Sequence, residues 1–184
     1  MADFALNTAR LVLRPFQESD APTFSAYRSD KDVALYQGWD APYPLAKAEE
    51  FIADMQPLKP GTAGEWYQIA LESRETGEHI GDLALHVLDE GDQAEIGFTL
   101  APQHHGHGYA SEAVERLLAF IFDDLKLHRV SATCDAENVA STRVLERVGM
   151  RREGHFVEAA WFKERWSSEF LYAMLQREWS AKQK

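Results

Sequence analysis

The stretch QHHGHGYASEA, residues 103–113, has the residue types of an anion-binding loop. Gly106 and Gly108 allow a tight backbone turn in which no side chain blocks the amide groups. Apolar residues at three- and four-residue steps then predict a helix over residues 108–125, and the first turn of a helix carries unpaired amides and the positive end of its dipole. The stretch therefore predicts a site for a phosphate or diphosphate group.

The spacing separates this loop from two common nucleotide-binding loops and from a metal site. A dinucleotide fingerprint requires G-x-G-x-x-G, but the last position here is Ser111, and a P-loop ends in Gly-Lys-Ser/Thr, which is absent. His104 and His105 are adjacent, and no Cys or acidic residue with suitable spacing lies nearby. We therefore expect a diphosphate site without a metal.

Composition limits the classes of protein to which the chain can belong. It has 184 residues, 45% of them hydrophobic and 27% charged, which predicts one globular domain over residues 1–184. A net charge of −11 gives no general attraction for nucleic acid or an anionic membrane and favours cationic partners such as amines. The sequence shows no long apolar run and no secretory signal, and it has a single cysteine, Cys134. We therefore expect a cytoplasmic protein without nucleic-acid or membrane partners.

Hydrophobic periodicity predicts a mixed α/β domain built around one sheet. Strands are expected over residues 10–15, 66–73, 79–88, 93–100, 129–134, 150–157 and 169–175. Helices are expected over residues 20–28, 45–55, 108–125 and 138–149. Short turns between the strands of residues 66–100 indicate an antiparallel meander, and residues 35–44 are expected to form a loop. Ser19 or Asp20 would cap the first helix, and Asn138 the last.

Four segments together resemble one family. Residues 103–108 match the Gln/Arg-x-x-Gly-x-Gly/Ala pyrophosphate loop of the GNAT superfamily of acetyl-CoA-dependent N-acetyltransferases, and residues 137–154 resemble its second conserved block. TARLVLRPFQESD (8–20) and YAMLQREW (172–179) resemble its ribosomal-protein alanine N-acetyltransferase branch, the RimJ/RimL type. The resemblance spans nearly the whole chain. It implies a mostly antiparallel, twisted sheet of about seven strands, splayed between the fourth and fifth and flanked by about four helices.

The resemblance also implies that acetyl-CoA is the co-substrate. Backbone amides from about His105 to Ala110 would hold the pyrophosphate, and an amide within Phe98 to Leu100 would stabilise the oxyanion of the reaction. Asn138 is fully explained as a helix cap, but in the family it also bonds the pantetheine arm. The residues expected to contact acetyl-CoA are Phe98, Thr99, Leu100, Gln103, His104, His105, Gly106, His107, Gly108, Tyr109, Ala110, Asn138 and Ser141.

Ser141 and Glu95 are the candidate catalytic residues. The resemblance places the Ser141 hydroxyl near the thioester sulfur, where it could protonate the leaving thiolate, although it could also be an ordinary first-turn residue. Many family members carry a Tyr one helical turn later, where this chain has Leu145. Glu95 could take the amine proton, directly or through water, or could be a solvent-facing strand residue. Glu158 and Glu169 are alternative bases.

The expected reaction is direct transfer of an acetyl group to a primary amine, either a protein N-terminus or a small cationic molecule. Tyr36 and Trp39 would contact this acceptor, because the family's acceptor cleft is bounded there. Trp161 could belong to a satellite core, or could form an aromatic wall for the acceptor. Asp30 and Asp32 could attract its charge, or could belong to a solvated loop. An acyl-CoA-binding sensor without turnover would carry the same motif. The C-terminal strands could also pair two copies of the chain as a homodimer.

Overall fold

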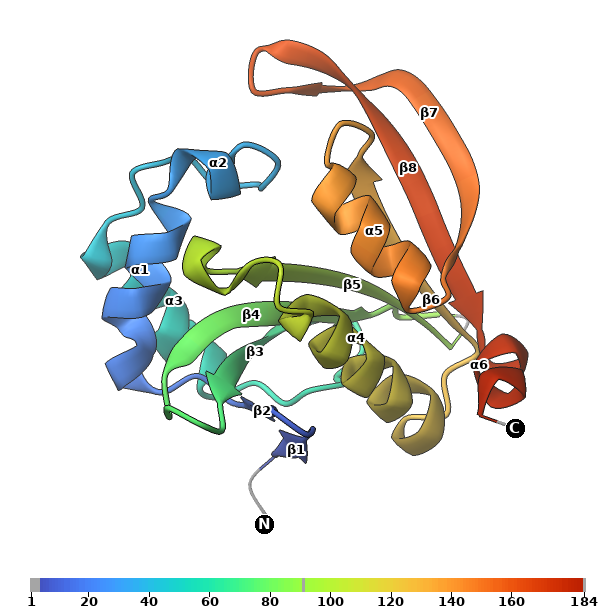
Figure 1. The fold of residues 1–184 in the computed structure, drawn as a ribbon, viewed down its shortest axis with the longest axis horizontal. Coiled ribbons are helices and arrows are strands. Elements are labelled where there is room, and N and C mark those ends of the chain that lie inside the picture. Colours follow the sequence, from blue (N-terminus) through green and yellow to red (C-terminus); the bar gives the residue numbers. More distant parts are fainter. Residues whose placement is uncertain (1–3, 91, 184) are drawn as a thin grey trace.

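Eight strands form one sheet in the computed structural model, which describes residues 4–90 and 92–183 (Figure 1). The strands are β1 (Leu6–Asn7), β2 (Leu11–Arg14), β3 (Trp66–Ser73), β4 (His79–Val87), β5 (Gln93–Leu100), β6 (Arg129–Asp135), β7 (Arg151–Phe162) and β8 (Arg165–Leu175). Their order across the sheet is β1-β2-β3-β4-β5-β6-β8-β7, and all neighbours are antiparallel except β5 and β6. The expected mixed α/β fold with a mostly antiparallel sheet is confirmed.

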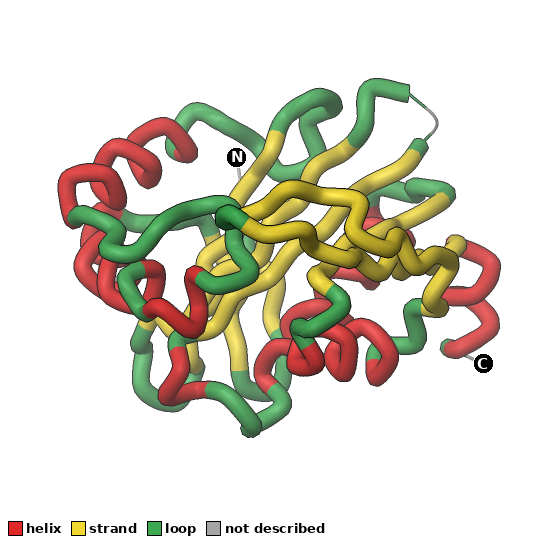
Figure 2. The backbone as a smooth tube through the Cα atoms, turned by 90° about the horizontal axis from the view of Figure 1, so that it is seen from above, coloured by secondary structure: helices red, strands yellow, loops and turns green. Residues whose placement is uncertain are grey.

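Helices lie to either side of these strands (Figure 2). They are α1 (Ala21–Arg28), α2 (Lys31–Ala34), α3 (Leu45–Met55), α4 (Tyr109–Ala119), α5 (Val139–Arg147) and α6 (Gln176–Lys182), and α4 continues into a π-helical turn, Phe120–Asp124. Alternate residues of β3 lie on opposite faces of the sheet. Ile69 and Leu71 belong to the core cluster under α4, whereas Ala70 packs with residues of α1 and α3.

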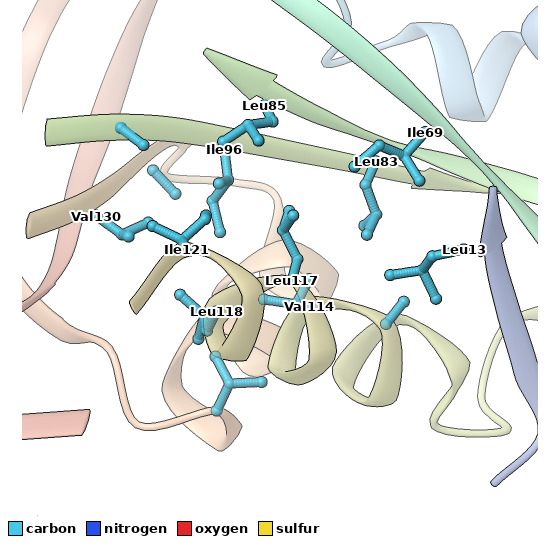
Figure 3. Close-up of a cluster of buried hydrophobic side chains, with 14 of the residues drawn as sticks. Leu13, Ile69, Leu83, Leu85, Ile96, Val114, Leu117, Leu118, Ile121 and Val130 are labelled. Carbon is cyan, nitrogen blue, oxygen red and sulfur yellow. The ribbon is translucent and has the colours of Figure 1, made fainter. Parts of the chain in front are cut away.

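The larger core lies between α4 and the sheet (Figure 3). Val114, Leu117 and Leu118 recur at three- and four-residue steps along α4, and all three are fully buried. They meet apolar side chains that alternate along the strands, among them Leu83 and Leu85 of β4. Burial of each such side chain contributes about 1.5–3 kcal/mol, so α4 is held firmly against the sheet.

The sheet splits between β5 and β6, the fourth and fifth of the expected strands. The two strands pair in parallel at three positions only, of which the last joins Glu95 to Ser131. Beyond that point β5 continues to Leu100 and β6 to Asp135, and the two strands part (Figure 1). The expected splay is confirmed, and it opens between α2 and α5.

Several elements differ from the sequence-based expectation. The strand β1 and the helices α2 and α6 were not expected, and β7 and β8 form a longer hairpin than residues 150–157 and 169–175 predicted. The edge strand β7 is mostly exposed, so its residues lack the alternation that marks a half-buried strand. In α6, Trp179 is buried against Phe122 and donates a hydrogen bond to Asp123. This long-range contact holds a helix too short to be stable alone.

The cap of α1 also differs from expectation. Asp20 occupies the N-cap position, but its side chain makes no capping hydrogen bond. Instead, Arg14 donates to both carboxylate oxygens of Asp20 at 2.7 and 2.9 Å, and both side chains are buried. The ion pair prevails because a buried guanidinium requires a partner. Among the described residues, no helix has the length and hydropathy needed to cross a membrane.

Candidate functional site

A cavity of about 610 Å³ lies beyond the point where β5 and β6 part. Its floor is the end of β5, Phe98–Leu100, and its walls are the first turn of α4, the helix α5 and the segment around α2. In Figure 1, α2 and α5 stand on opposite sides of the end of β5. The splay thus creates a cleft that borders two helix N-termini, those of α4 and α5.

The loop before α4 presents its backbone to this cleft. Gly106 and Gly108 have φ angles of 78° and 80°, in the left-handed region that L side chains rarely adopt, and Gly108 is the N-cap of α4. The first helical hydrogen bond runs from the amide of Glu112 to the carbonyl of Gly108 at 3.1 Å. The amides of residues 109–111 precede that bond and have no acceptor within the helix. The loop can therefore bind an anion through backbone amides.

The run of free backbone amides starts one residue later than His105, where the sequence analysis expected it to begin. The amide of His105 donates to the carbonyl of Pro102 at 3.1 Å, so the free donors begin at Gly106. The ring of His105 lies 2.9 Å from the carbonyl oxygen of Leu100 and ties the loop to the end of β5. His104 lines the cavity, whereas Gln103 and His107 do not. The predicted loop is therefore placed at the cleft, with two of its residues outside the cavity lining.

Arg10 ties this loop to the N-terminal strands. Its guanidinium donates to the carbonyl of His107 at 2.9 Å and to the carboxylate of Glu112 at 2.7 Å, and it lies 4.5 Å from the centre of the Tyr109 ring. Thr8 also donates to Glu112, at 2.6 Å. Burial alone would raise the pKa of the Glu112 carboxyl, but hydrogen bonds from Thr8 and Arg10 outweigh it and lower the pKa. A charged Glu112 is thus neutralised beside the anion-binding amides.

Hydrophobic periodicity does not reveal this contact, because more than a hundred positions separate Glu112 from Arg10. Its alternation with Leu11 and Leu13 indicated only a solvent-facing residue of a first strand. Thr8 lies in the same segment, two residues earlier. The hydroxyl of Thr8 and the guanidinium of Arg10, two residues apart just before β2, are the signal that could have pointed to a carboxylate partner.

The start of α5 places two predicted residues in the cleft. Asn138 accepts a hydrogen bond from the amide of Ser141 through its Oδ1 at 3.1 Å, which confirms it as the helix cap. The cap uses only Oδ1, so the Nδ2 hydrogens can donate to a ligand. Asn138 and Ser141 both line the cavity. Leu145, at the position where the resemblance expects a Tyr, is 1% exposed and belongs to the core.

The remaining predicted residues are dispersed. Tyr36 lines the cavity, but Trp39 does not, because its ring packs at 3.9 Å on the Arg28 guanidinium and its indole donates to the Arg28 carbonyl. Trp161 is 63% exposed on the β7–β8 hairpin, outside the cavity lining. Glu95 stands where the strands part, in register with Ser131, and also lies outside the lining. Proton transfer to Glu95 would therefore need an intervening water.

Charged residues of opposite sign face each other across the cleft. Asp30 and Asp32 line it beside α2, while Arg143 and Arg147 line it from α5. Asp30 is held by the amides of Asp32 and Val33, which donate to its Oδ1 at 2.9 and 3.1 Å. The two arginines escaped the sequence analysis, although their four-residue spacing places them on one face of a helix. The cleft thus offers an acidic wall and a basic wall.

Two other groups that could do chemistry lie elsewhere. Cys134 is half-buried, and burial raises the pKa of its thiol, which disfavours a reactive thiolate. It does not line the cavity. Over residues 4–90 and 92–183, no group of three His, Cys, Asp or Glu side chains is arranged to hold a metal ion.

Comparisons with known proteins identify the family of the chain. The family model described as "Acetyltransferase (GNAT) domain" matches residues 10–151. The uncharacterized N-acetyltransferase YnaD of Bacillus subtilis is 33% identical over 175 residues, which cover 95% of this chain and 99% of that protein. The putative ribosomal N-acetyltransferase YdaF of Bacillus subtilis is 32% identical over 104 residues, 56% of this chain and 57% of that protein. The crystal structure of a GNAT-family acetyltransferase from Bacillus anthracis has a TM-score of 0.86 at 30% identity, covering 95% of this chain and 100% of that one.

Proposed function

Because the chain belongs to the GNAT acetyltransferase family and is an N-acetyltransferase, we propose that it moves an acetyl group from acetyl-CoA directly to a primary amine in the cleft. The resemblance to the ribosomal-protein acetyltransferase branch is confirmed as well, but a relative's name does not fix the acceptor. The observation that carries the proposal is that one cavity joins the amides after Gly106 to Asn138 and Ser141.

The cleft has the donors that acetyl-CoA requires. The backbone amides from Gly106 to Ser111 would hold the pyrophosphate, as the positive end of the α4 dipole favours. Arg143 and Arg147 would add positive charge on the α5 side. Asn138 would donate its Nδ2 to the pantetheine arm while its Oδ1 stays in the helix cap. The thioester would then lie between α5 and the end of β5.

Transfer needs a neutral amine, an oxyanion site and a proton for the thiolate. The amine nitrogen attacks the thioester carbonyl, so that an N–C bond forms and the C–S bond breaks. A backbone amide of Phe98 to Leu100 would stabilise the oxyanion, because β5 has no neighbouring strand on its β6 side there. Ser141 would protonate the leaving thiolate. Glu95 would receive the amine proton through water.

The acidic wall favours an acceptor that carries positive charge. Asp30 and Asp32 would attract a cationic amine, and Tyr36 would pack against its carbon chain. A protein N-terminus has a pKa of about 7.7–8.0, so about half of it is neutral near pH 8, whereas an alkylamine with a pKa near 10.4 must lose its proton in the cleft. Both kinds of acceptor fit a wall of this charge.

The test is release of CoA thiol from acetyl-CoA with and without pooled amines. The pools are ribosomal-protein N-terminal peptides, polyamines, aminoglycosides and amino acids, and the Ser141→Ala variant serves as the matched control. Amine-dependent release that falls in the variant is the expected result. Acetyl-CoA binding by calorimetry without release in any pool would favour an acyl-CoA sensor. Absence of both binding and release would refute the proposal.

A further inference from the structure

The turn between β7 and β8 contacts the α2 side of the cleft through one lysine. Lys163 donates from its Nζ to the carbonyl of Ala34 at 2.6 Å and to the carbonyl of Trp39 at 2.7 Å, and it lies 3.7 Å from the Asp40 carboxylate. Ala34 is the last residue of α2. The ammonium therefore joins the end of α2 to the loop that follows it, in a position where a cation is favoured.

The same turn contacts the α5 side through Arg165, two residues later. Its guanidinium donates to Asp135 at 2.8 Å and to Glu137 at 3.0 Å, and Ser167 donates to Asp135 at 2.6 Å. The side chain of Asp135 is 7% exposed, so this end of the contact is largely shielded from water. Glu137 directly precedes Asn138, the cap of α5, and Asp135 is the last residue of β6. The turn is thus bonded to both walls of the cleft.

The turn spans the walls without entering the cavity. Neither Lys163 nor Arg165 lines the cavity, whereas Asp32 and Tyr36 line it from one wall and Ser141 from the other. Figure 1 shows the closed end of the hairpin above both α2 and α5. A segment that bonds to two walls and lies outside the space between them fixes their separation.

The backbone of the turn sets where these two side chains leave the hairpin. Lys163 and Glu164 have φ angles of 47° and 62°, as both central residues of a two-residue type I′ turn require, and Phe162 pairs with Arg165 on either side of them. This tight turn places Lys163 and Arg165 two residues apart at the closed end of the hairpin, from which each contacts one wall.

We propose that Lys163 is a positioning residue that holds the acidic wall of α2 at the distance from α5 that the amine acceptor requires. The proposal rests on the proposed function. Its effect is confined to the acceptor, because the anion-binding loop is fixed separately by Arg10 and Glu112 and has no bond to the turn among those described. Lys163 thus bears on how the acceptor is seated, while acetyl-CoA binding depends on other contacts.

The decisive variant is Lys163→Met, which keeps the aliphatic stem and removes the ammonium. Lys163→Arg is the conservative variant, and Lys59→Met is the matched control on an exposed lysine that does not line the cavity. We expect Lys163→Met to raise the KM of the acceptor about ten-fold, as loss of a charge-assisted hydrogen bond would, with the KM of acetyl-CoA unchanged. Lys163→Arg should raise the acceptor KM less than Lys163→Met does, and Lys59→Met should have the KM of the wild type.

A second readout does not depend on activity. In hydrogen exchange, Lys163→Met should speed exchange of amides in residues 34–40 and leave residues 109–112 as in the wild type. The proposal is overturned if exchange in residues 34–40 is unchanged. It is also overturned if the KM values of acceptor and acetyl-CoA rise together, which indicates general loss of structure. If the wild type acetylates no amine, the proposed function fails, while the exchange result still decides whether the turn holds α2.

Discussion

Removal of the Arg10 side chain should weaken CoA binding although Arg10 contacts no part of the cavity lining other than the loop and Tyr109. Arg10→Ala removes two interactions from the loop. The first is the hydrogen bond to the His107 carbonyl, which holds the backbone between Gly106 and Gly108. The second is the charge that neutralises Glu112 in the first turn of α4.

The size of the effect follows from these two losses. The Arg10 side chain is 45% exposed, so its hydrogen bond to His107 is worth about 1 kcal/mol, below the value for a buried charged group. For an assumed separation of about 8 Å and an effective dielectric constant near 40, Coulomb's law gives about 1 kcal/mol of repulsion between a bound phosphate and a Glu112 carboxylate that has lost its guanidinium partner. Together these amount to about 2 kcal/mol, or roughly a thirty-fold rise in Kd.

Calorimetric titration with CoA measures this directly, because CoA carries the same pyrophosphate and is not turned over. The double variant Arg10→Ala/Glu112→Gln removes the carboxylate charge as well and should recover about 1 kcal/mol, close to five-fold in Kd. Thermal unfolding of each variant would establish that the chain is folded. A double variant that binds CoA no better than Arg10→Ala would refute the electrostatic part of the reasoning, and an unchanged Kd in Arg10→Ala would refute all of it.

Three further predictions concern single side chains. Asn138→Ala should lower the free energy of unfolding by about 1 kcal/mol in urea, because it removes the α5 cap. Asn138→Asp keeps the cap and should unfold like the wild type but bind CoA more weakly, so equal CoA affinity would exclude an Nδ2 contact. Ser141→Ala should lower kcat about 100-fold with little change in acetyl-CoA affinity, and an unchanged kcat in a rapid-quench assay would remove Ser141 from the mechanism. Hydrogen bonds from Arg129 and Arg151 lower the pKa of Glu153 from 4.5 to about 2. Since the folded-state pKa is the lower one, this carboxylate stabilises the fold above about pH 4.5, and the contribution is lost as pH falls through about 2. The pairs are partly exposed, so the contribution is below about 1 kcal/mol. In urea unfolding, Glu153→Gln should reduce the change in the free energy of unfolding between about pH 5 and about pH 2 by that amount.

Local periodicity was enough to predict much of the fold. The expected bounds of β3, β5 and α3 coincide with those observed, because each has a strong apolar pattern and ends at a turn or proline signal. The positive φ angles of Gly106 and Gly108 were foreseeable for the same reason, since only glycine adopts them freely. Patterns of period two or 3.6 carry this information because neighbouring residues alone determine them.

Contacts between distant residues could not be predicted in this way. Arg10 meets Glu112, and Lys163 meets the end of α2, across more than a hundred positions of the chain. The exposed strand β7 has no buried face and hence no alternating pattern to mark its full length. Trp39 was expected at the acceptor because it lies near Tyr36 in sequence, but the Arg28 guanidinium draws its ring away from the cleft. In each case a residue distant in sequence determines where the side chain or strand lies, and the local pattern does not reveal that residue.

The short pairing of β5 with β6 has a consequence for aggregation. Beyond Glu95, the backbone of β5 forms a strand edge in the interior of the molecule. An exposed edge of this kind is a hazard, because another polypeptide can add to it as a further strand. Here the edge forms the floor of a cleft whose walls are α4, α5 and the segment around α2, which limits access for a strand that belongs to a sheet of another chain. The protein can thus keep its backbone ready for a narrow ligand without offering a template for misassembly.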